Sequence, residues 1–267
     1  MDLLNLFLLF LAGCGTGFLA GFFGVGGGVI LVPLLLYYFH SIGVSSLVAT
    51  HLTFGTSLLV VIFASSSSAY NYWRNGHVVW RGVLLIGLAS VVGASLGATI
   101  AAGLQAKTLQ QVFGTVVAIT AIRLLVEEGH RKKDPHTGAR DPGMLGAGFV
   151  TGIVSSLAGV GGGVISIPLM YYLLGFPLKK AVGTSSATIV ITASAAAVGY
   201  TVEGWGNPLL PDHTLGFVDY THALPLIIGA IPLASLGATV AQKTHVDRLR
   251  RFFAVFLLVV AIKMFLF

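Results

Sequence analysis

Residues 24–34 read Gly-Val-Gly-Gly-Gly-Val-Ile-Leu-Val-Pro-Leu, and residues 159–169 read Gly-Val-Gly-Gly-Gly-Val-Ile-Ser-Ile-Pro-Leu. The two stretches lie 135 residues apart. Self-similarity of this kind indicates that one structural unit has been duplicated. We therefore interpret the chain as two homologous units, each containing one glycine run.

The similarity extends along both units. Ala-Thr-His-Leu-Thr at 49–53 falls on Thr-Ser-Ser-Ala-Thr at 184–188 when no gap is allowed, and Ser-Leu-Gly-Ala-Thr at 95–99 matches 235–239 after a five-residue insertion. A strongly charged stretch separates the units, as expected of an exposed linker. We predict a first membrane repeat at 1–126, a charged cytoplasmic linker at 127–142 and a second membrane repeat at 143–267.

The composition is that of a membrane protein. Hydrophobic residues make up 55% of the 267 residues and charged residues only 9%, and the mean hydropathy is +0.91. A soluble domain carries about a quarter of its residues as charged ones, so the composition excludes a soluble enzyme, a nucleic-acid binder and a disordered chain. The single Cys14 permits no internal disulfide and no multi-cysteine metal site. We expect lipid around the protein and no cofactor or metal ion.

Three apolar segments in each unit are long enough to cross a bilayer, whose core needs about 20 helical residues. They are 44–70, 76–103 and 108–126, then 180–200, 217–242 and 247–267. The first segment of each unit is too long, because residues 3–39 as one helix would extend roughly 55 Å through a core of about 30 Å. The glycine run favours positive φ and should break it into 3–22 and 29–39.

The basic residues favour one path for these broken segments. If both segments cross the membrane, 8 Lys and Arg residues lie on one side of it and 7 on the other. If both are re-entrant hairpins, 13 lie on one side and only 2, Lys107 and Lys263, on the other. Cytoplasmic loops are enriched in Lys and Arg, so we predict six crossings and two hairpins, with both termini outside the cytoplasm. Three crossings per unit should invert the units, which gives an all-α polytopic fold typical of secondary transporters.

The glycine runs are the first candidate site. Non-helical backbone at membrane depth is tolerated where protein or a polar cavity surrounds it, and each run leads into a helix whose first N–H groups attract an anion. A Cβ there is expected to block binding more than it disturbs folding, although such glycines can also serve only to let helices pack closely. The candidate substrate-binding glycines are Gly24, Gly26, Gly27, Gly28, Gly159, Gly161, Gly162 and Gly163.

The second segment of each unit adds polar side chains to an apolar helix. The candidate ligands are Thr50, His51 and Thr53 in the first unit and Thr184, Ser185, Ser186 and Thr188 in the second. Hydroxyls bind an anion without adding charge, but they can also bond back to helix carbonyls. His51 could donate a hydrogen bond to the anion, carry a proton, or be a neutral histidine satisfied by a hydroxyl, and His222 is a weaker candidate. The run Ser65–Ser68 is expected to approach the membrane interface.

The duplicated Gly24–Pro33 and Gly159–Pro168 segments, with Lys-Ala-Val-Gly-Thr-Ser at 180–185, resemble the TauE/SafE family of sulfite and organosulfonate exporters over the full chain. In the first unit the second element reads Leu-Val-Ala-Thr-His at 47–51 and departs from the family's Ala-Val-Gly-Thr-Ser. The resemblance implies a multi-pass transporter of the bacterial inner membrane that exports a small sulfur oxyanion or sulfonate, such as sulfite.

Other functions stay open at this point. A passive anion channel would pass flux that ignores the proton gradient, and an importer would need coupling to an energy source. An intramembrane serine hydrolase could place Ser185 or Ser186 near His51 or His222, with glycine N–H groups as the oxyanion hole. Nothing in the sequence ties these serines to these histidines, so we expect a transporter and not an enzyme.

Overall fold

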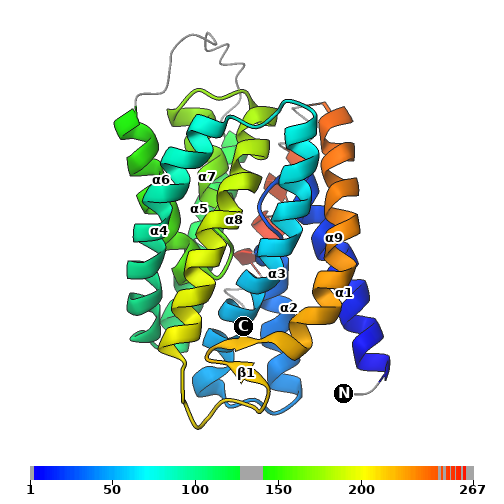
Figure 1. Cartoon of the computed structure of the whole chain (residues 1–267), viewed down its shortest axis with the longest axis vertical. Helices are drawn as coiled ribbons and strands as arrows, with labels where there is room; N and C mark the ends of the chain where they lie inside the picture. Colours follow the sequence, from blue (N-terminus) through cyan, green and yellow to red (C-terminus); the bar gives the residue numbers. More distant parts are fainter. Residues whose placement is uncertain are drawn as a thin grey trace.

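The computed structural model describes residues 3–126 and 141–245, and parts of a further helical stretch between 248 and 262. The first unit contains α1 Leu3–Phe23, α2 Gly28–Ser41, α3 Ser46–Arg74, α4 Trp80–Ala102 and α5 Ala106–Val126. The second contains α6 Asp141–Ala158, α7 Gly163–Pro168, the π-helical turn η1 Leu169–Leu173, α8 Leu178–Glu203 and α9 Tyr220–Lys243. The result is an all-α polytopic bundle (Figure 1). Residues 127–140 of the predicted linker lie outside the described residues.

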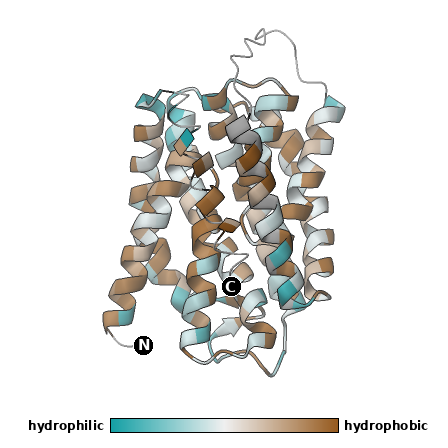
Figure 2. Ribbon diagram, turned by 180° about the vertical axis from the view of Figure 1, so that it is seen from behind, coloured by the Kyte–Doolittle hydropathy of each residue, from teal (hydrophilic) through white to brown (hydrophobic). Residues whose placement is uncertain are grey.

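The outer surface of the bundle is apolar. The helices α1, α3, α4, α8 and α9 are long and apolar enough to cross a membrane. The outward face of α4 exposes a large hydrophobic side chain every fourth residue, at Leu84, Leu88, Val92, Leu96 and Ile100. Figure 2 shows apolar colours along the helices and hydrophilic colours mainly toward the two ends. Lipid is the solvent that suits such a surface.

One predicted helix begins later than expected. The apolar segment predicted at 217–242 starts as a strand, because β1 Thr214–Leu215 pairs with β2 Val218–Asp219 and α9 begins only at Tyr220. Asp219 has extended backbone angles and its side chain accepts a hydrogen bond from the His222 N–H, which makes it the N-cap of α9. Hydrophobicity alone did not reveal this start, because Phe217 and Val218 extend the apolar run N-terminal to the helix.

The first hairpin returns to the end from which it enters. Gly13 and Gly17 of α1 lie against Leu226 and Ala230 of α9, so the two helices run side by side in the same direction. At the other end of the hairpin, the ring of Tyr38 in α2 lies 5.2 Å from the ring of His222, in the first turn of α9. The start of α1 and the end of α2 therefore lie at the same end of the bundle.

The second hairpin enters from the opposite end. Arg81 at the start of α4 forms a 2.8 Å ion pair with Asp141 at the start of α6. After η1 the chain comes back to this place, because the Phe176 ring lies beside Gly82. Since α4 starts where α3 ends and α9 starts near the first half of α3, the two hairpins approach the centre from opposite ends (Figure 1).

The two repeats share one core. The helix α1 of the first repeat packs along α9 of the second, and α6 of the second packs along α4 of the first. Between these pairs, α3 and α8 pack against each other. The largest buried cluster contains apolar side chains of both repeats. Each hairpin is therefore held by the other repeat, and the division of the chain into 1–126 and 143–267 stays a prediction from sequence.

Candidate substrate site at the two glycine loops

Both helix breaks are built from glycines with positive φ. In the first loop Gly24, Gly26 and Gly27 have φ of 71°, 80° and 83°; in the second, Gly159, Gly161 and Gly162 have φ of 64°, 73° and 84°. A residue with a Cβ is strained at these angles, so the repeated glycines are required by the backbone itself. Gly27 and Gly162 are the left-handed N-caps of α2 and α7.

The two loops meet at the centre of the molecule. A Cβ added to Gly28 would lie 2.6 Å from the Val160 Cα, and one added to Gly163 would lie 2.5 Å from the Val25 Cα. These reciprocal contacts mean that the backbone of each loop packs directly on the other. The structure thus brings all eight predicted glycines together, and it also gives them a packing role.

Two apolar side chains lie between the loops. Val61 of α3 and Ile189 of α8 each contact both Gly26 and Gly161, within 3.3 Å of the position that a Cβ would take. The same pair of side chains therefore serves both loops. Val61 and Ile189 therefore occupy equivalent positions in the two repeats.

The equivalence of Val61 and Ile189 corrects the sequence alignment of α3 with α8. The ungapped offset of 135 placed Thr50 on Ser185 and His51 on Ser186, and that register is wrong. Val61 corresponds in space to Ile189, so α3 and α8 match at an offset of 128. The physical reason is length: α2 and the start of α3 contain seven more residues than α7, η1 and the start of α8, while both loops must reach the same centre.

At this offset both repeats carry the same Gly-Thr-Ser element, at residues 55–57 and 183–185. Ser57 Oγ donates a 2.6 Å hydrogen bond to the Gly159 carbonyl, and Ser185 Oγ donates a 3.2 Å hydrogen bond to the Gly24 carbonyl. Each serine thus holds the glycine loop of the opposite repeat. The first unit therefore keeps Gly-Thr-Ser and departs from Ala-Val-Gly-Thr-Ser only at Thr53 and Phe54.

The threonines of this element also correspond. Thr56 Oγ1 accepts a 2.9 Å hydrogen bond from the Asp219 N–H, and Thr184 Oγ1 accepts one of the same length from the Val79 N–H. Asp219 and Val79 are the N-caps of α9 and α4. Sequence reasoning missed Thr56 and Ser57, although the repeated Gly-Thr-Ser tripeptide was the signal that could have found them.

The remaining predicted ligands are buried in α3 and α8. Thr50 and Thr53 lie in the first third of α3 and are closer to its N-terminal end than Ser57 is. Thr188 Oγ1 donates to the Thr184 carbonyl, which is a bond back to its own helix. Ser186 Oγ bonds to the Val182 carbonyl and to Ser68 Oγ. Ser185, in contrast, donates to the Gly24 carbonyl of a glycine loop.

His51 lies near the end of the bundle at which α9 begins. Its Nε2 is 3.0 Å from the carbonyl of Ala101, in the last turn of α4, and its ring lies 5.1 Å from the Phe217 ring. When Nε2 carries the proton and donates to that carbonyl, Nδ1 of the neutral ring is an acceptor. An anion would then need a protonated ring to receive a hydrogen bond from His51.

The serine run of α3 is partly buried, and Ser65 lies beside Gly26 of the central glycine loop, so the expected place at the membrane interface is wrong for this residue. Ser65 and Ser68 are each 1% exposed, while Ser66 faces outward and Ser67 donates to the Ile231 carbonyl. The helical period explains the difference, because residues 65 and 68 share the face of α3 that packs on α8. A run of identical residues hides this period in the sequence.

Comparison with known proteins decides the family. The family model described as "Sulfite exporter TauE/SafE" matches residues 9–264. The chain belongs to the TauE/SafE family. It is 30% identical to a probable membrane transporter protein of Haemophilus influenzae over 97% of both chains. It is 28% identical to one of Methanocaldococcus jannaschii, over 93% of this chain and 91% of the relative. No solved structure matches.

Membership of the TauE/SafE family makes this chain a multi-pass membrane transporter of the inner membrane. The hydrogen bonds do not favour the hydrolase alternative. Ser185 Oγ lies 2.7 Å from Ser166 Oγ, and Ser186 Oγ lies 3.2 Å from Ser68 Oγ of α3. In the described residues neither serine is hydrogen-bonded to a histidine.

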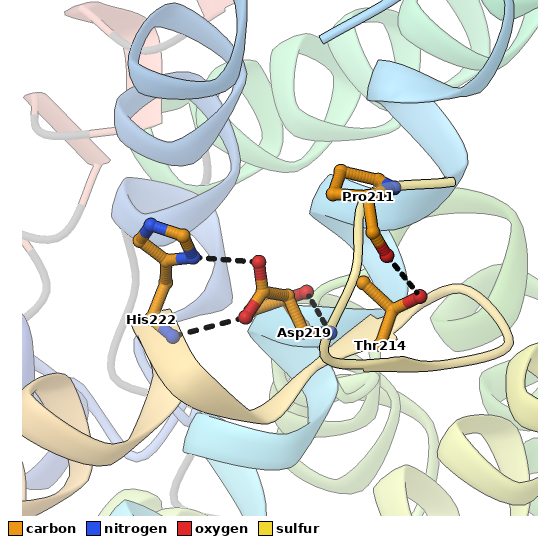
Figure 3. Close-up of polar contacts among 5 residues, drawn as sticks. Pro211, Thr214, Asp219 and His222 are labelled. Atoms are coloured by element: carbon orange, nitrogen blue, oxygen red, sulfur yellow. Dashed lines mark hydrogen bonds and ion pairs between the residues drawn. The ribbon is translucent and has the colours of Figure 1, made fainter. Parts of the chain in front are cut away.

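A contact between Asp219 and His222 lies at an end of this TauE/SafE transporter. His222 Nδ1 is 2.6 Å from Asp219 Oδ2, and the His222 N–H donates to Asp219 Oδ1 at 3.0 Å (Figure 3). The carboxylate thereby caps α9 and anchors its histidine beside Tyr38 of α2. His222 therefore joins the first hairpin to α9, away from the glycine loops.

Proposed function

We propose that this transporter exports a small sulfur-containing anion, sulfite or an organosulfonate, which binds at mid-depth beside the glycine loops. The observation that carries the proposal is the start of α2 at the centre of the protein. Gly27 caps α2 in the left-handed conformation, and no side chain of the described residues caps it. The first N–H groups of a helix lack partners within the helix and favour an anion.

The charges of the described residues support an anion over a cation. The acidic residues of this part of the chain are Asp141, Glu203, Asp212 and Asp219, and all lie at helix ends or in the loop before α9. The glycine loops are surrounded instead by hydroxyls, amides and apolar side chains. Such a site has donors for an oxyanion and no carboxylate to attract a cation.

The membrane potential can supply the driving force for export. An anion leaving a cell that is negative inside gains about 2.3 kcal/mol per charge per 100 mV. A singly charged substrate therefore needs no coupling ion, whereas import would need one. The membrane potential therefore favours export, as does the description of the family as sulfite exporters.

A passive channel is the second candidate, and the packing argues against it. Val61 and Ile189 fill the centre between the loops, and the loop backbones touch each other. An ion would need these groups to separate before it could pass. Alternating exposure of the loops to the two sides is the motion that the opposed hairpins suit.

Flux in proteoliposomes tests the proposal. We expect a saturable flux of sulfite or a small sulfonate that follows the membrane potential and changes little under an imposed pH gradient. Sulfate and thiosulfate serve as competing oxyanions, and protein-free vesicles as the control. Failure of every oxyanion to move would refute the substrate class. A flux that does not saturate would favour the channel, and a flux that needs an imposed proton gradient would favour an importer.

A further inference from the structure

When α3 is aligned with α8, some hydroxyl groups make equivalent hydrogen bonds in both repeats and others do not. Ser57 and Ser185 hold the glycine loops, and Tyr72 and Tyr200 donate to the carbonyls of Gly21 and Ser156. These contacts occur in both repeats and therefore belong to the fold.

Three buried serines break the match. Ser65, Ser68 and Ser186 correspond at the offset of 128 to Ala193, Ala196 and Leu58, which are also fully buried. Ser65 and Ser68 lie one turn apart on the same face of α3, and Ser68 Oγ lies 3.2 Å from Ser186 Oγ of α8. These three serines therefore form contacts that the other repeat does not reproduce with serines.

The cluster lies beside the first glycine loop. Ser65 Oγ is 3.0 Å from the position that a Cβ on Gly26 would take, and Ser186 bonds to the carbonyl of Val182, which packs on Gly24. Ser65 Oγ is buried and has no hydrogen-bond partner among the described residues. A buried hydroxyl without a partner lowers stability, and its hydrogen bond is available to a ligand.

We propose that Ser65 is a substrate ligand, and that one anion site is formed at the first glycine loop by Ser65 and the uncapped start of α2. This inference rests on the proposed function and makes it more specific, because the two loops are then not equivalent. The helix α2 has 14 residues, whereas α7 has six before it changes into η1. Because η1 continues α7 to Leu173, both loops lead into a helix, and the serine cluster beside Gly26 is the feature that distinguishes the first loop.

The chemistry of this site favours a singly charged oxyanion. Its donors are hydroxyls and amides, and the described basic side chains lie at the ends of the bundle or in the loops. The cost of removing an ion from water grows with the square of its charge, so a dianion costs about four times as much as a monoanion of the same size. A short alkanesulfonate should therefore bind more tightly than sulfate.

Binding to purified full-length protein, followed by thermal shift and by titration calorimetry, tests the inference with methanesulfonate and sulfate as probes. We expect Ser65→Ala to weaken methanesulfonate binding about tenfold, because a hydrogen bond to a charged group is lost. Without ligand its melting temperature should equal or exceed that of the wild type, because an unpartnered hydroxyl is removed. A purely structural serine would show the opposite: lower stability and unchanged affinity.

Two controls locate the site. Ser66→Ala changes the exposed neighbour and should alter neither property. Ser155→Ala removes a buried, unpartnered hydroxyl beside Gly162 of the second loop and should leave affinity unchanged. If Ser155→Ala and not Ser65→Ala loses binding, the site is at the second loop and the inference is wrong.

The wild type separates this inference from the proposed function. If it binds neither probe and no other small sulfur oxyanion, the proposed function fails and the inference fails with it. If the wild type binds methanesulfonate and Ser65→Ala binds it equally well, only the inference fails. Should Ser65→Ala not fold, Ser65→Cys keeps the side-chain size with a weaker donor and should show an intermediate loss.

Discussion

Each glycine of the two loops has an identifiable physical reason. Gly24, Gly26 and Gly27 are needed for positive φ, whereas Gly28 has helical angles and is needed because the Val160 backbone lies against it. The expectation that a Cβ in the loops would affect binding more than folding is therefore hard to test at these positions. Substitution there should disturb the fold whether or not the substrate approaches the backbone.

Gly28→Ala and Gly163→Ala test the contact between the loops, because both residues lack positive φ and only the contact is disturbed. We expect each substitution to destabilise the protein by about 1–3 kcal/mol, the usual cost of overpacking. Gly15→Ala in α1 and Gly146→Ala in α6 are matched controls, since a Cβ there meets nothing within 4 Å. Melting temperatures in detergent give the measurement, and equal effects at all four positions would contradict the packing role.

At the scale of elements, the Gly-Thr-Ser segments tie three parts of the fold together. The serine of each segment holds a glycine loop, and the threonine accepts the N–H of the residue that precedes α4 or α9. A movement of either hairpin is thereby linked to the start of a crossing helix. Because these hydrogen bonds are the same in both repeats, we expect them to contribute to stability rather than to substrate binding.

Thr56→Val and Thr184→Val remove the acceptor and keep the side-chain shape. Each leaves a buried backbone N–H without its partner, so we expect a loss of about 1–3 kcal/mol in the free energy of unfolding. Thr188→Val is the control, because the Thr188 hydroxyl bonds only to the Thr184 carbonyl within α8 in the described contacts. It should change stability by about 0.5 kcal/mol or less. Urea or thermal unfolding of the purified variants compares the three, and a loss as large in Thr188→Val would contradict the role of the other two.

At the scale of the whole molecule, the hairpins enter from opposite ends and each packs on a helix of the other repeat. Residues Arg74, Arg81, Lys179 and Lys243 lie at the end where α4 and α6 begin, because Arg81 pairs with Asp141 and Lys179 bonds to the Gln242 carbonyl. The start of α1 lies at the other end. Basic residues mark the cytoplasmic side, so the first end is predicted to face the cytoplasm.

Single cysteines at Asn5, Thr137 and Phe267, in a chain carrying Cys14→Ser, test this orientation. A membrane-impermeant thiol reagent applied to intact cells should label positions 5 and 267 but not 137, which should react only after the membrane is opened. Labelling of 5 and 137 from the same side would contradict an odd number of crossings per repeat. Wild-type transport by each variant provides the control for correct insertion.

The all-α membrane fold, the breaks at the glycine runs and most helix ends could be predicted from the sequence to within a few residues. These follow from local properties: hydrophobic length against the thickness of the bilayer, and the access of glycine to positive φ. The repeated glycine motif also predicted the family. None of these inferences needs knowledge of which segments lie side by side.

The match between α3 and α8 and the hydrogen bonds of the hydroxyls could not be predicted without the contacts between helices. The repeats differ by seven residues between the glycine loop and the Gly-Thr-Ser element, so an ungapped comparison aligned Thr50 and His51 with the wrong partners. Likewise, four consecutive serines look alike in sequence, yet only Ser65 and Ser68 face the interior. Contacts such as Ser57 to Gly159 join residues about a hundred positions apart, and they are fixed by packing across the centre, which no local pattern records.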